Sequence, residues 1–320
     1  MPGMALGTTE LGETGLAITR LGFGAWAIGG GEWEFGWGPQ ADEQSLAAIE
    51  RALELGVNWI DTAAAYGFGH SEEIVGRALR GLAEPPYVFT KCSLLEGPGR
   101  KVKHNLERDS IMREAHASLE RLGVQALDLY QIHWPIPPED IEQGWAALAE
   151  LRQEGLVRHI GVSNFSVGKL QRIQQIAPVE TIQPEYSLIE RAAEPKLLPF
   201  AEDEGIGVIV YSPMGSGMLT GAMTRERVQR LPPEDWRKSD PRFNEPALSA
   251  NLALVERLER VAGRHDVTPG AVAVAWTLAN PAVDGAIVGF RSPEQVDPVM
   301  AAAALQLSPE DIREIEGGEG

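Results

Sequence analysis

The chain has 320 residues, 43% of them hydrophobic, which is enough to bury a large core and excludes a short peptide module or a disordered chain. Its 28 Lys and Arg against 46 Asp and Glu leave a formal net charge of −18, which repels phosphate backbones and argues against a nucleic-acid partner. The one cysteine, Cys92, cannot form an intrachain disulfide or a usual zinc cage, which favours a cytoplasmic location. Neither a secretion signal nor an apolar run of about eighteen residues is present, so we expect neither export nor a membrane span.

Short apolar or β-branched runs recur along the chain and predict eight strands, because each has the length of a buried strand. These runs cover residues 21–26, 57–63, 87–91, 127–133, 159–164, 181–187, 207–213 and 285–290. Between them lie stretches with apolar residues at spacings of three and four, which predict helices, for example at 41–55, 71–82, 109–122 and 139–155.

This alternation of strand and helix predicts one α/β domain over residues 1–320, a parallel eight-stranded (β/α)8 TIM barrel. Residues 214–250, after the seventh strand, are too rich in Gly and Pro for a helix and are expected to form a long functional loop. Extra helices at 251–264 and 269–279 precede the eighth strand, an eighth helix is expected at 293–305, and Ser308 caps a short terminal helix.

Four ionisable side chains lie at or just beyond the ends of three neighbouring strands. Asp61 ends the second strand with Tyr66 five residues on, Lys91 ends the third, and His133 ends the fourth. Active sites of such barrels lie at the carboxyl ends of the strands, so these side chains should face one mouth. A buried Asp and Lys need pairing, and Lys91 beside Tyr66 would lower the tyrosine pKa, which suits acid catalysis at a carbonyl.

Each residue alone has an ordinary structural explanation. Asp61 could cap a loop, Lys91 could be an edge lysine that reaches solvent, and His133 or Tyr66 could be a core residue. Their joint occurrence at matched strand ends favours the catalytic interpretation.

Several motifs in a fixed order resemble the aldo-keto reductase superfamily over almost the whole chain. They are GFGAWAIGGG at 22–31, DTAAAYGFGHSEEIVGRAL at 61–79, TKC at 90–92, QIHW at 131–134, GVSNF at 161–165, QPEYS at 183–187 and YSPMGSGMLTG at 211–221. The resemblance looks closest to the bacterial subgroup of inositol-operon and general-stress reductases. It implies an NADP(H)-dependent oxidoreductase (EC 1.1.1.-) without a metal, in which Tyr66 is the general acid, Lys91 and Asp61 tune it and His133 orients the carbonyl.

The resemblance also assigns the cofactor. Ser163, Asn164 and Gln183 would hold the nicotinamide carboxamide and Tyr211 would stack on its ring. The pyrophosphate path and the adenosine site would be lined by Ser212, Met214, Gly215, Gly217, Leu219, Gly289, Arg291 and Gln295. The loop at 214–250 would cover the cofactor. Arg291 and Gln295 favour NADP(H) and leave NAD(H) possible, because Pro298 and Val299 replace a Glu-Asn pair common in relatives.

A Rossmann dinucleotide domain does not fit the glycine-rich segments. Gly22-x-Gly24 and Gly215-x-Gly217 would need a third glycine at Ala27 and at Thr220. The cofactor residues therefore belong to the barrel.

Aromatic residues of the first, second and fourth strand-end loops predict an apolar substrate pocket for a small aldehyde, ketone or sugar, although simple loop packing explains them equally well. They are Trp26, Trp33, Trp37, Phe68 and Trp134.

Two other classes of protein stay open. A regulatory subunit would bind NADP(H) with little turnover, and a metal-dependent hydrolase would need more ligands than Asp61 and His133. The substrate, the reaction direction and the oligomeric state are not predicted from the sequence.

Overall fold

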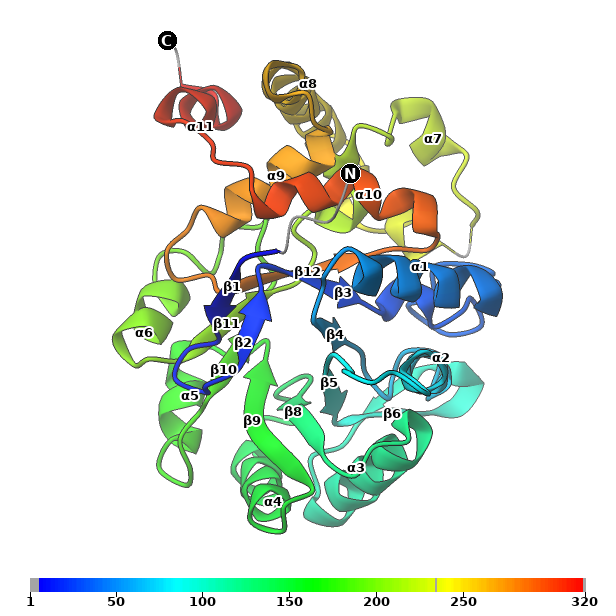
Figure 1. Cartoon of the computed structure of the whole chain (residues 1–320), viewed down its shortest axis with the longest axis vertical. Helices are drawn as coiled ribbons and strands as arrows, with labels where there is room; N and C mark the ends of the chain where they lie inside the picture. The colour runs from blue at the N-terminus through cyan, green and yellow to red at the C-terminus, as the bar shows by residue number, and fades with distance from the viewer. Residues whose placement is uncertain (1–5, 234, 319–320) are drawn as a thin grey trace.

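Eight parallel strands close into a barrel in the computed structural model, which describes residues 6–233 and 235–318 (Figure 1). In order around the barrel, they are β3 (Leu21–Gly24), β4 (Trp59–Asp61), β5 (Tyr87–Cys92), β8 (Leu127–Ile132), β9 (Val157–Ser163), β10 (Thr181–Gln183), β11 (Gly207–Val210) and β12 (Gly285–Gly289). All eight coincide with predicted runs, so the (β/α)8 fold is confirmed.

The barrel interior changes from apolar to polar within two residues along the strands. Trp59, Phe89 and Leu129 pack in one fully buried apolar cluster with Ile209. Because strand side chains alternate, residues two positions later face the interior again, nearer the carboxyl end, and on β4, β5 and β8 they are Asp61, Lys91 and Gln131. This alternation brings polar groups together at one end of the barrel.

An antiparallel hairpin at the amino end, which the sequence did not predict, closes the other end of the barrel. Its strands are β1 (Thr8–Glu10) and β2 (Ala17–Thr19). Leu11, Leu16 and Ile18 of the hairpin join the same apolar cluster as Trp59. This end is therefore filled by packing and leaves the opposite end for the loops.

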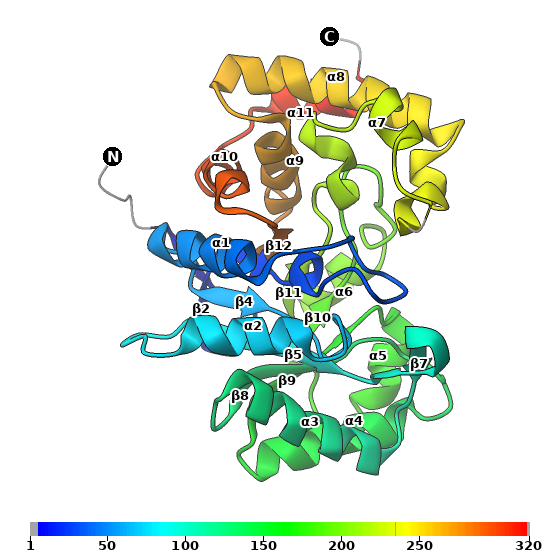
Figure 2. The same ribbon diagram turned by 90° about the vertical axis from the view of Figure 1, so that its right-hand side faces the viewer.

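Helices surround the barrel on the outside (Figures 1 and 2). The four predicted between residues 41 and 155 are α1 (Asp42–Glu54), α2 (His70–Leu79), α3 (Arg108–Leu122) and α4 (Ile141–Gln153). They are followed by α5 (Val167–Ile173), α6 (Leu197–Asp203), α8 (Ala247–His265), α9 (Pro269–Leu278) and α11 (Pro309–Glu316). Ser308 caps α11 in a capping box with Asp311, as its sequence predicts.

Two predicted segments differ from the structure. The region 293–305 is not one helix but three short pieces, the 3₁₀ turn Pro293–Gln295, α10 (Asp297–Met300) and the 3₁₀ turn Ala301–Ala303. Pro293 and Pro298 lie in the first turns of two of these pieces, where the missing N–H and fixed φ of proline interrupt a longer helix. The long loop ends at residue 246, because α8 begins at Ala247, and it contains the short helix α7 (Arg225–Gln229).

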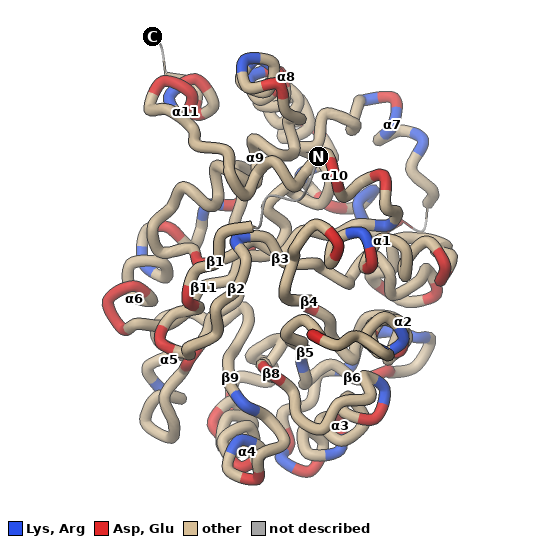
Figure 3. Tube along the Cα trace, in the orientation of Figure 1, with Lys and Arg blue, Asp and Glu red and all other residues tan. Residues whose placement is uncertain are grey.

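A second unpredicted hairpin follows β5 and comprises β6 (Leu94–Glu96) and β7 (Val102–His104). The charged residues lie mostly on the outer helices and loops (Figure 3). Within residues 6–233 and 235–318, no group of three or more His, Cys, Asp or Glu has the arrangement of a metal site. In the same part of the chain, no helix combines the length and the apolar character that crossing a membrane needs.

Candidate active site

A buried ion pair lies at the carboxyl ends of β4 and β5. Lys91 Nζ donates to Asp61 Oδ1 at 2.5 Å and to the Thr62 carbonyl oxygen at 2.9 Å, and both charged side chains are almost completely buried. The second carboxylate oxygen, Asp61 Oδ2, accepts a hydrogen bond from Gln183 Nε2 at 2.9 Å. A buried pair is tolerated when further hydrogen bonds satisfy its polar atoms, and here both carboxylate oxygens and two of the three ammonium protons are bonded.

Tyr66 and His133 lie over this ion pair. Lys91 Nζ is 5.3 Å from the centre of the Tyr66 ring, and the Tyr66 and His133 rings meet edge to face with their centres 5.6 Å apart. The structure therefore brings together the four ionisable residues that the sequence singled out.

The electrostatics of Tyr66 differ from the sequence prediction. Burial raises the pKa of Tyr66 well above its ordinary value, and the charge of Asp61 raises it further. Lys91 does not lower it, because the lysine charge is neutralised by its partner at 2.5 Å. Tyr66 therefore keeps its proton at neutral pH and is suited to donate it.

Burial also determines the states of the other three groups. It lowers the pKa of His133 well below its ordinary value, and the charge of Lys91 acts in the same direction, so the imidazole is neutral at pH 7. Burial raises the pKa of Asp61 and lowers that of Lys91, while the attraction between the two charges opposes both changes. The site thus combines a protonated phenol, a neutral imidazole and a buried ion pair.

The side chains predicted for the carboxamide form a connected group at the ends of β9, β10 and β11. Tyr211 OH donates to Asn164 Oδ1 at 2.9 Å, and Asn164 Nδ2 donates to Ser163 Oγ and to the His133 carbonyl oxygen, each at 3.0 Å. Ser163 Oγ donates in turn to the Gln183 carbonyl oxygen at 2.7 Å. This group connects directly to Asp61 through Gln183 Nε2.

The backbone after β11 winds through an unusual turn. Ser212, Gly215, Ser216 and Gly217 all have left-handed φ angles of 54°, 55°, 55° and 91°. At Gly217 a Cβ would meet only Arg237 Nη1, at 3.9 Å, so the backbone surface there is open. Such a turn with small residues allows close approach of an anionic group to the main chain.

Arg237 lies beside this turn, and Arg291 lies near Arg237. Arg291 donates through Nε to Gln40 Oε1 at 2.9 Å, and its backbone N–H donates to Gln295 Oε1 at 2.8 Å. Arg237 comes from the long loop, forms an ion pair with Asp235 at 2.6 Å, and is close enough to lower the Arg291 pKa after the larger effect of burial.

Pro298 and Val299 stand at the two positions where relatives commonly have the Glu-Asn pair that helps to hold the adenine. Val299 is buried in the hydrophobic core, and the Pro298 carbonyl oxygen accepts a hydrogen bond from Thr268 Oγ1 at 3.0 Å. Val299 therefore serves packing.

Two of the aromatic residues predicted to line the substrate pocket lie beside Tyr66, and a third packs against one of them. Trp26 and Trp33 have ring centres 6.4 and 6.2 Å from that of Tyr66, and Phe68 meets Trp33 at 6.0 Å. Trp134 differs, because it is 38% exposed and stands apart from these ring contacts. The aromatic wall thus comes from the first and second strand-end loops.

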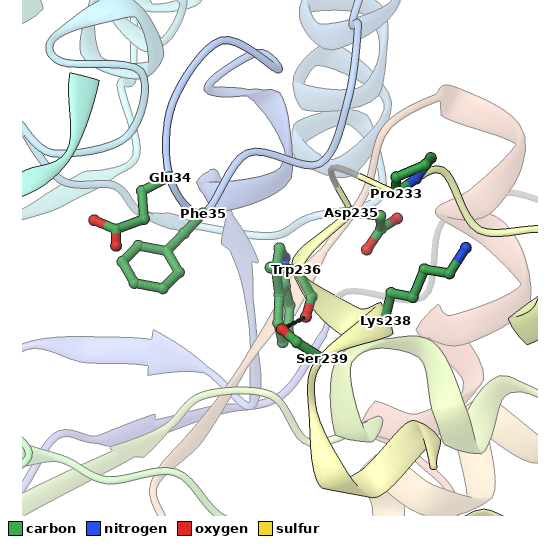
Figure 4. Close-up of a pocket in the computed structure, with 7 residues that line it drawn as sticks. All are labelled: Glu34, Phe35, Pro233, Asp235, Trp236, Lys238 and Ser239. Atoms are coloured by element: carbon green, nitrogen blue, oxygen red, sulfur yellow. Dashed lines mark hydrogen bonds between the residues drawn. The ribbon is translucent and has the colours of Figure 1, made fainter. Parts of the chain in front are cut away.

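The long loop adds residues that sequence reasoning missed. Trp236 stacks on Trp26 with ring centres 5.4 Å apart and meets Trp37 edge to face at 5.6 Å. Across from it lies Phe35, and between the two segments is a pocket of about 400 Å³ (Figure 4). Its lining comprises Glu34, Phe35, Pro233, Asp235, Trp236, Lys238 and Ser239. No sequence signal relates positions 35 and 236, because only the tertiary fold brings these two loops together.

Comparison with known proteins identifies the class to which this fold and site belong. The family model described as "Aldo/keto reductase family" matches residues 20–318. The chain therefore belongs to the aldo/keto reductase family of oxidoreductases, which act on small carbonyl compounds and alcohols with a nicotinamide cofactor.

Individual relatives support this assignment over nearly the full length. The chain is 37% identical to "Aldo-keto reductase YhdN" of Bacillus subtilis (strain 168), covering 96% of this chain and 92% of the relative. It is 37% identical to "NADH-specific methylglyoxal reductase" of Escherichia coli (strain K12), covering 94% of each. The solved glycerol dehydrogenase AKR11B4 from Gluconobacter oxydans superposes with a TM-score of 0.88 at 36% identity, covering 98% and 95% of the two chains.

Proposed function

We propose that the protein reduces small aldehydes or ketones with a nicotinamide cofactor, and oxidises the matching alcohols or sugars in reverse, with Tyr66 as general acid and base. The observation that carries this proposal is the buried Asp61–Lys91 pair beneath a Tyr66 whose pKa is raised. A tyrosine that holds its proton until a developing alkoxide takes it is an effective acid catalyst.

The chain's own residues supply the proton and orient the carbonyl. Tyr66 donates its phenolic proton to the carbonyl oxygen, and the Asp61–Lys91 ion pair lies beneath its ring, with Lys91 Nζ 5.3 Å from the ring centre. The neutral His133 donates a hydrogen bond to the same oxygen, which polarises the carbonyl.

The residues present fit a dinucleotide. The amide and hydroxyl groups of Ser163, Asn164 and Gln183 would hold the carboxamide, and Tyr211 would contact the ring. The open backbone at Gly217 and the two arginines would hold the phosphates. When bound, the nicotinamide supplies or accepts the hydride.

We assign NADP(H) as the preferred cofactor. Arg237 and Arg291 carry two positive charges, of which Asp235 neutralises one, so one net positive charge is left for a 2′-phosphate. The Escherichia coli relative is named as NADH-specific, so the preference needs a direct measurement with both cofactors.

The experiment is to follow NADPH oxidation with a panel of small aldehydes, ketones and sugars, with NADH in parallel. Tyr66→Phe should lower kcat by at least about 100-fold while NADPH still binds, because general acid catalysis is worth about 10²–10⁴-fold. Unchanged kcat in the variant would reject the role of Tyr66. Tight NADPH binding without reduction of any compound would instead support a regulatory subunit.

A further inference from the structure

Gln131 lies in the polar layer of the barrel interior without a part in the chemistry described so far. On β8 it pairs in register with Lys91 of β5 on one side and with Gly161 of β9 on the other. It is fully buried, whereas Leu129, two residues earlier on the same inward face, belongs to the apolar cluster. Gln131 is therefore the point at which β8 changes from apolar to polar.

The side chain of Gln131 reaches the catalytic ion pair through one intermediate. Gln183 Nε2 donates to Gln131 Oε1 at 3.4 Å and to Asp61 Oδ2 at 2.9 Å. Gln183 thus bridges the two strands β8 and β4 across the interior. Asp61 Oδ1 is held by Lys91 Nζ, so a continuous chain of contacts runs from Gln131 through Gln183 and Asp61 to Lys91.

Packing alone does not account for an amide at this position. Burying an amide costs free energy unless its hydrogen bonds compensate fully, and Gln183 supplies one bond at 3.4 Å. A methionine of similar volume would fill the same space without that cost.

We propose that Gln131 is a positioning residue, which orients the Gln183 amide so that its nitrogen holds Asp61 and its oxygen stays directed to the cofactor carboxamide. The inference rests on the proposed function, in which Gln183 contacts the carboxamide. The buried contacts from Gln131 through Gln183 to Asp61 would then connect the cofactor site to the ion pair. Asp61 in turn holds Lys91 beneath Tyr66.

The test compares Gln131→Met with the matched control Leu129→Met, which changes the adjacent inward-facing position in the apolar layer. In the full-length protein, Gln131→Met should keep or raise the melting temperature, weaken NADPH binding several-fold by tryptophan fluorescence, and lower kcat about 10-fold. Leu129→Met should alter neither NADPH binding nor kcat by more than about twofold.

A second readout does not depend on activity. The Asp61 carboxyl carbon is followed by NMR against pH, with Asp61→Asn identifying the signal, and Lys91, Tyr66 and His133 are the titratable groups that face it. Without Gln131, the Gln183 amide would no longer be held in the orientation that donates to the Asp61 carboxylate. The Asp61 midpoint should then move upward by about one pH unit, because a hydrogen bond to a carboxylate favours its charged form. The control should leave the midpoint in place.

The outcomes separate this inference from the proposed function. If wild-type protein reduces nothing, the proposed function fails, while an upward Asp61 midpoint in Gln131→Met still supports the positioning role. An Asp61 midpoint and an NADPH affinity equal to those of wild type overturn it. Should Gln131→Met fail to fold, Gln131→Glu keeps the shape, and its NADPH affinity should fall as the introduced carboxyl ionises beside Asp61. An affinity that does not vary with pH in that variant also overturns it.

Discussion

At the scale of single residues, the site depends on how its charges are buried. Lys91 and Asp61 are removed from water together, so each relies on the other to remain ionised. Tyr66 keeps its proton because it lies above a pair whose net charge is zero and inside an aromatic wall. The chemistry of all three groups therefore depends on contacts with one another.

Removing one member of the ion pair should be costly. Lys91→Met leaves the Asp61 carboxylate buried without its partner, and we expect the free energy of unfolding to fall by about 3–5 kcal/mol at pH 7. Urea denaturation measures this change. The double variant Asp61→Leu/Lys91→Met should recover most of the loss, and a double variant as unstable as the single one would contradict the account.

Arg291 should discriminate between the two nicotinamide cofactors. Arg291→Ala removes a guanidinium that is half-buried beside Gln40, and its loss should weaken NADPH at least about 10-fold while changing NADH little, because a charge-assisted contact is worth about 1.5–3 kcal/mol. Titration of tryptophan fluorescence with each cofactor gives both dissociation constants. Arg313→Ala, on the exposed face of α11, is the control, and equal losses for the two cofactors would remove the 2′-phosphate role.

At the scale of the elements, two glycines show how the strands and helices position the site. A Cβ on Gly161 of β9 would lie 2.0 Å from Thr181 Oγ1 and 3.0 Å from the Thr181 carbonyl oxygen, so only glycine fits between β9 and β10. Gly168 in α5 has nothing within 4 Å of the same atom. The first glycine permits close packing of the barrel, and the second does not constrain its helix.

Alanine should therefore have opposite effects at the two positions. Gly161→Ala forces β10 or the Thr181 side chain to move and should cost about 1–3 kcal/mol of unfolding free energy. Gly168→Ala should add about 0.5–1 kcal/mol, because alanine is the better helix former. Thermal unfolding followed by circular dichroism measures both, and a stabilising Gly161→Ala would show that the strands are less closely packed than this structure has them.

At the scale of the whole molecule, buried acids outside the site make stability depend on pH. Glu114 of α3 is buried against β5, accepts hydrogen bonds from Ser93 N at 2.9 Å and Ser110 Oγ at 3.0 Å, and burial raises its pKa from 4.5 to about 7. Between pH 4.5 and about pH 7, Glu114 is protonated in the folded protein and ionised in the unfolded chain. The stability that Glu114 contributes is therefore complete below pH 4.5 and is lost as the pH rises through about 7.

Replacing Glu114 should make the free energy of unfolding depend less on pH. From pH 5 to pH 8 the wild-type unfolding free energy should decline relative to that of Glu114→Gln by up to about 3 kcal/mol, since each unit of pKa change is worth about 1.4 kcal/mol. Chemical denaturation at several pH values provides the comparison. Parallel profiles for the two proteins would mean that Glu114 titrates at its ordinary value.

The barrel and the grouping of the four candidate site residues were both predictable from the sequence. Eight apolar runs set the strands, and parallel strands in a barrel present their carboxyl ends at one mouth, so Asp61, Lys91 and His133 had to converge. Tyr66 followed because it lies five residues beyond one of these ends.

The behaviour of these groups depends on the folded structure. The stacking of Trp236 on Trp26, the bridge from Gln131 to Asp61, and the division of 293–305 into short turns all depend on packing between distant segments. The raised pKa of Tyr66 likewise depends on burial and on the distances between charges. Periodicity along a chain specifies which side chains face inward, whereas a pKa or a contact between loops depends on distances across the fold.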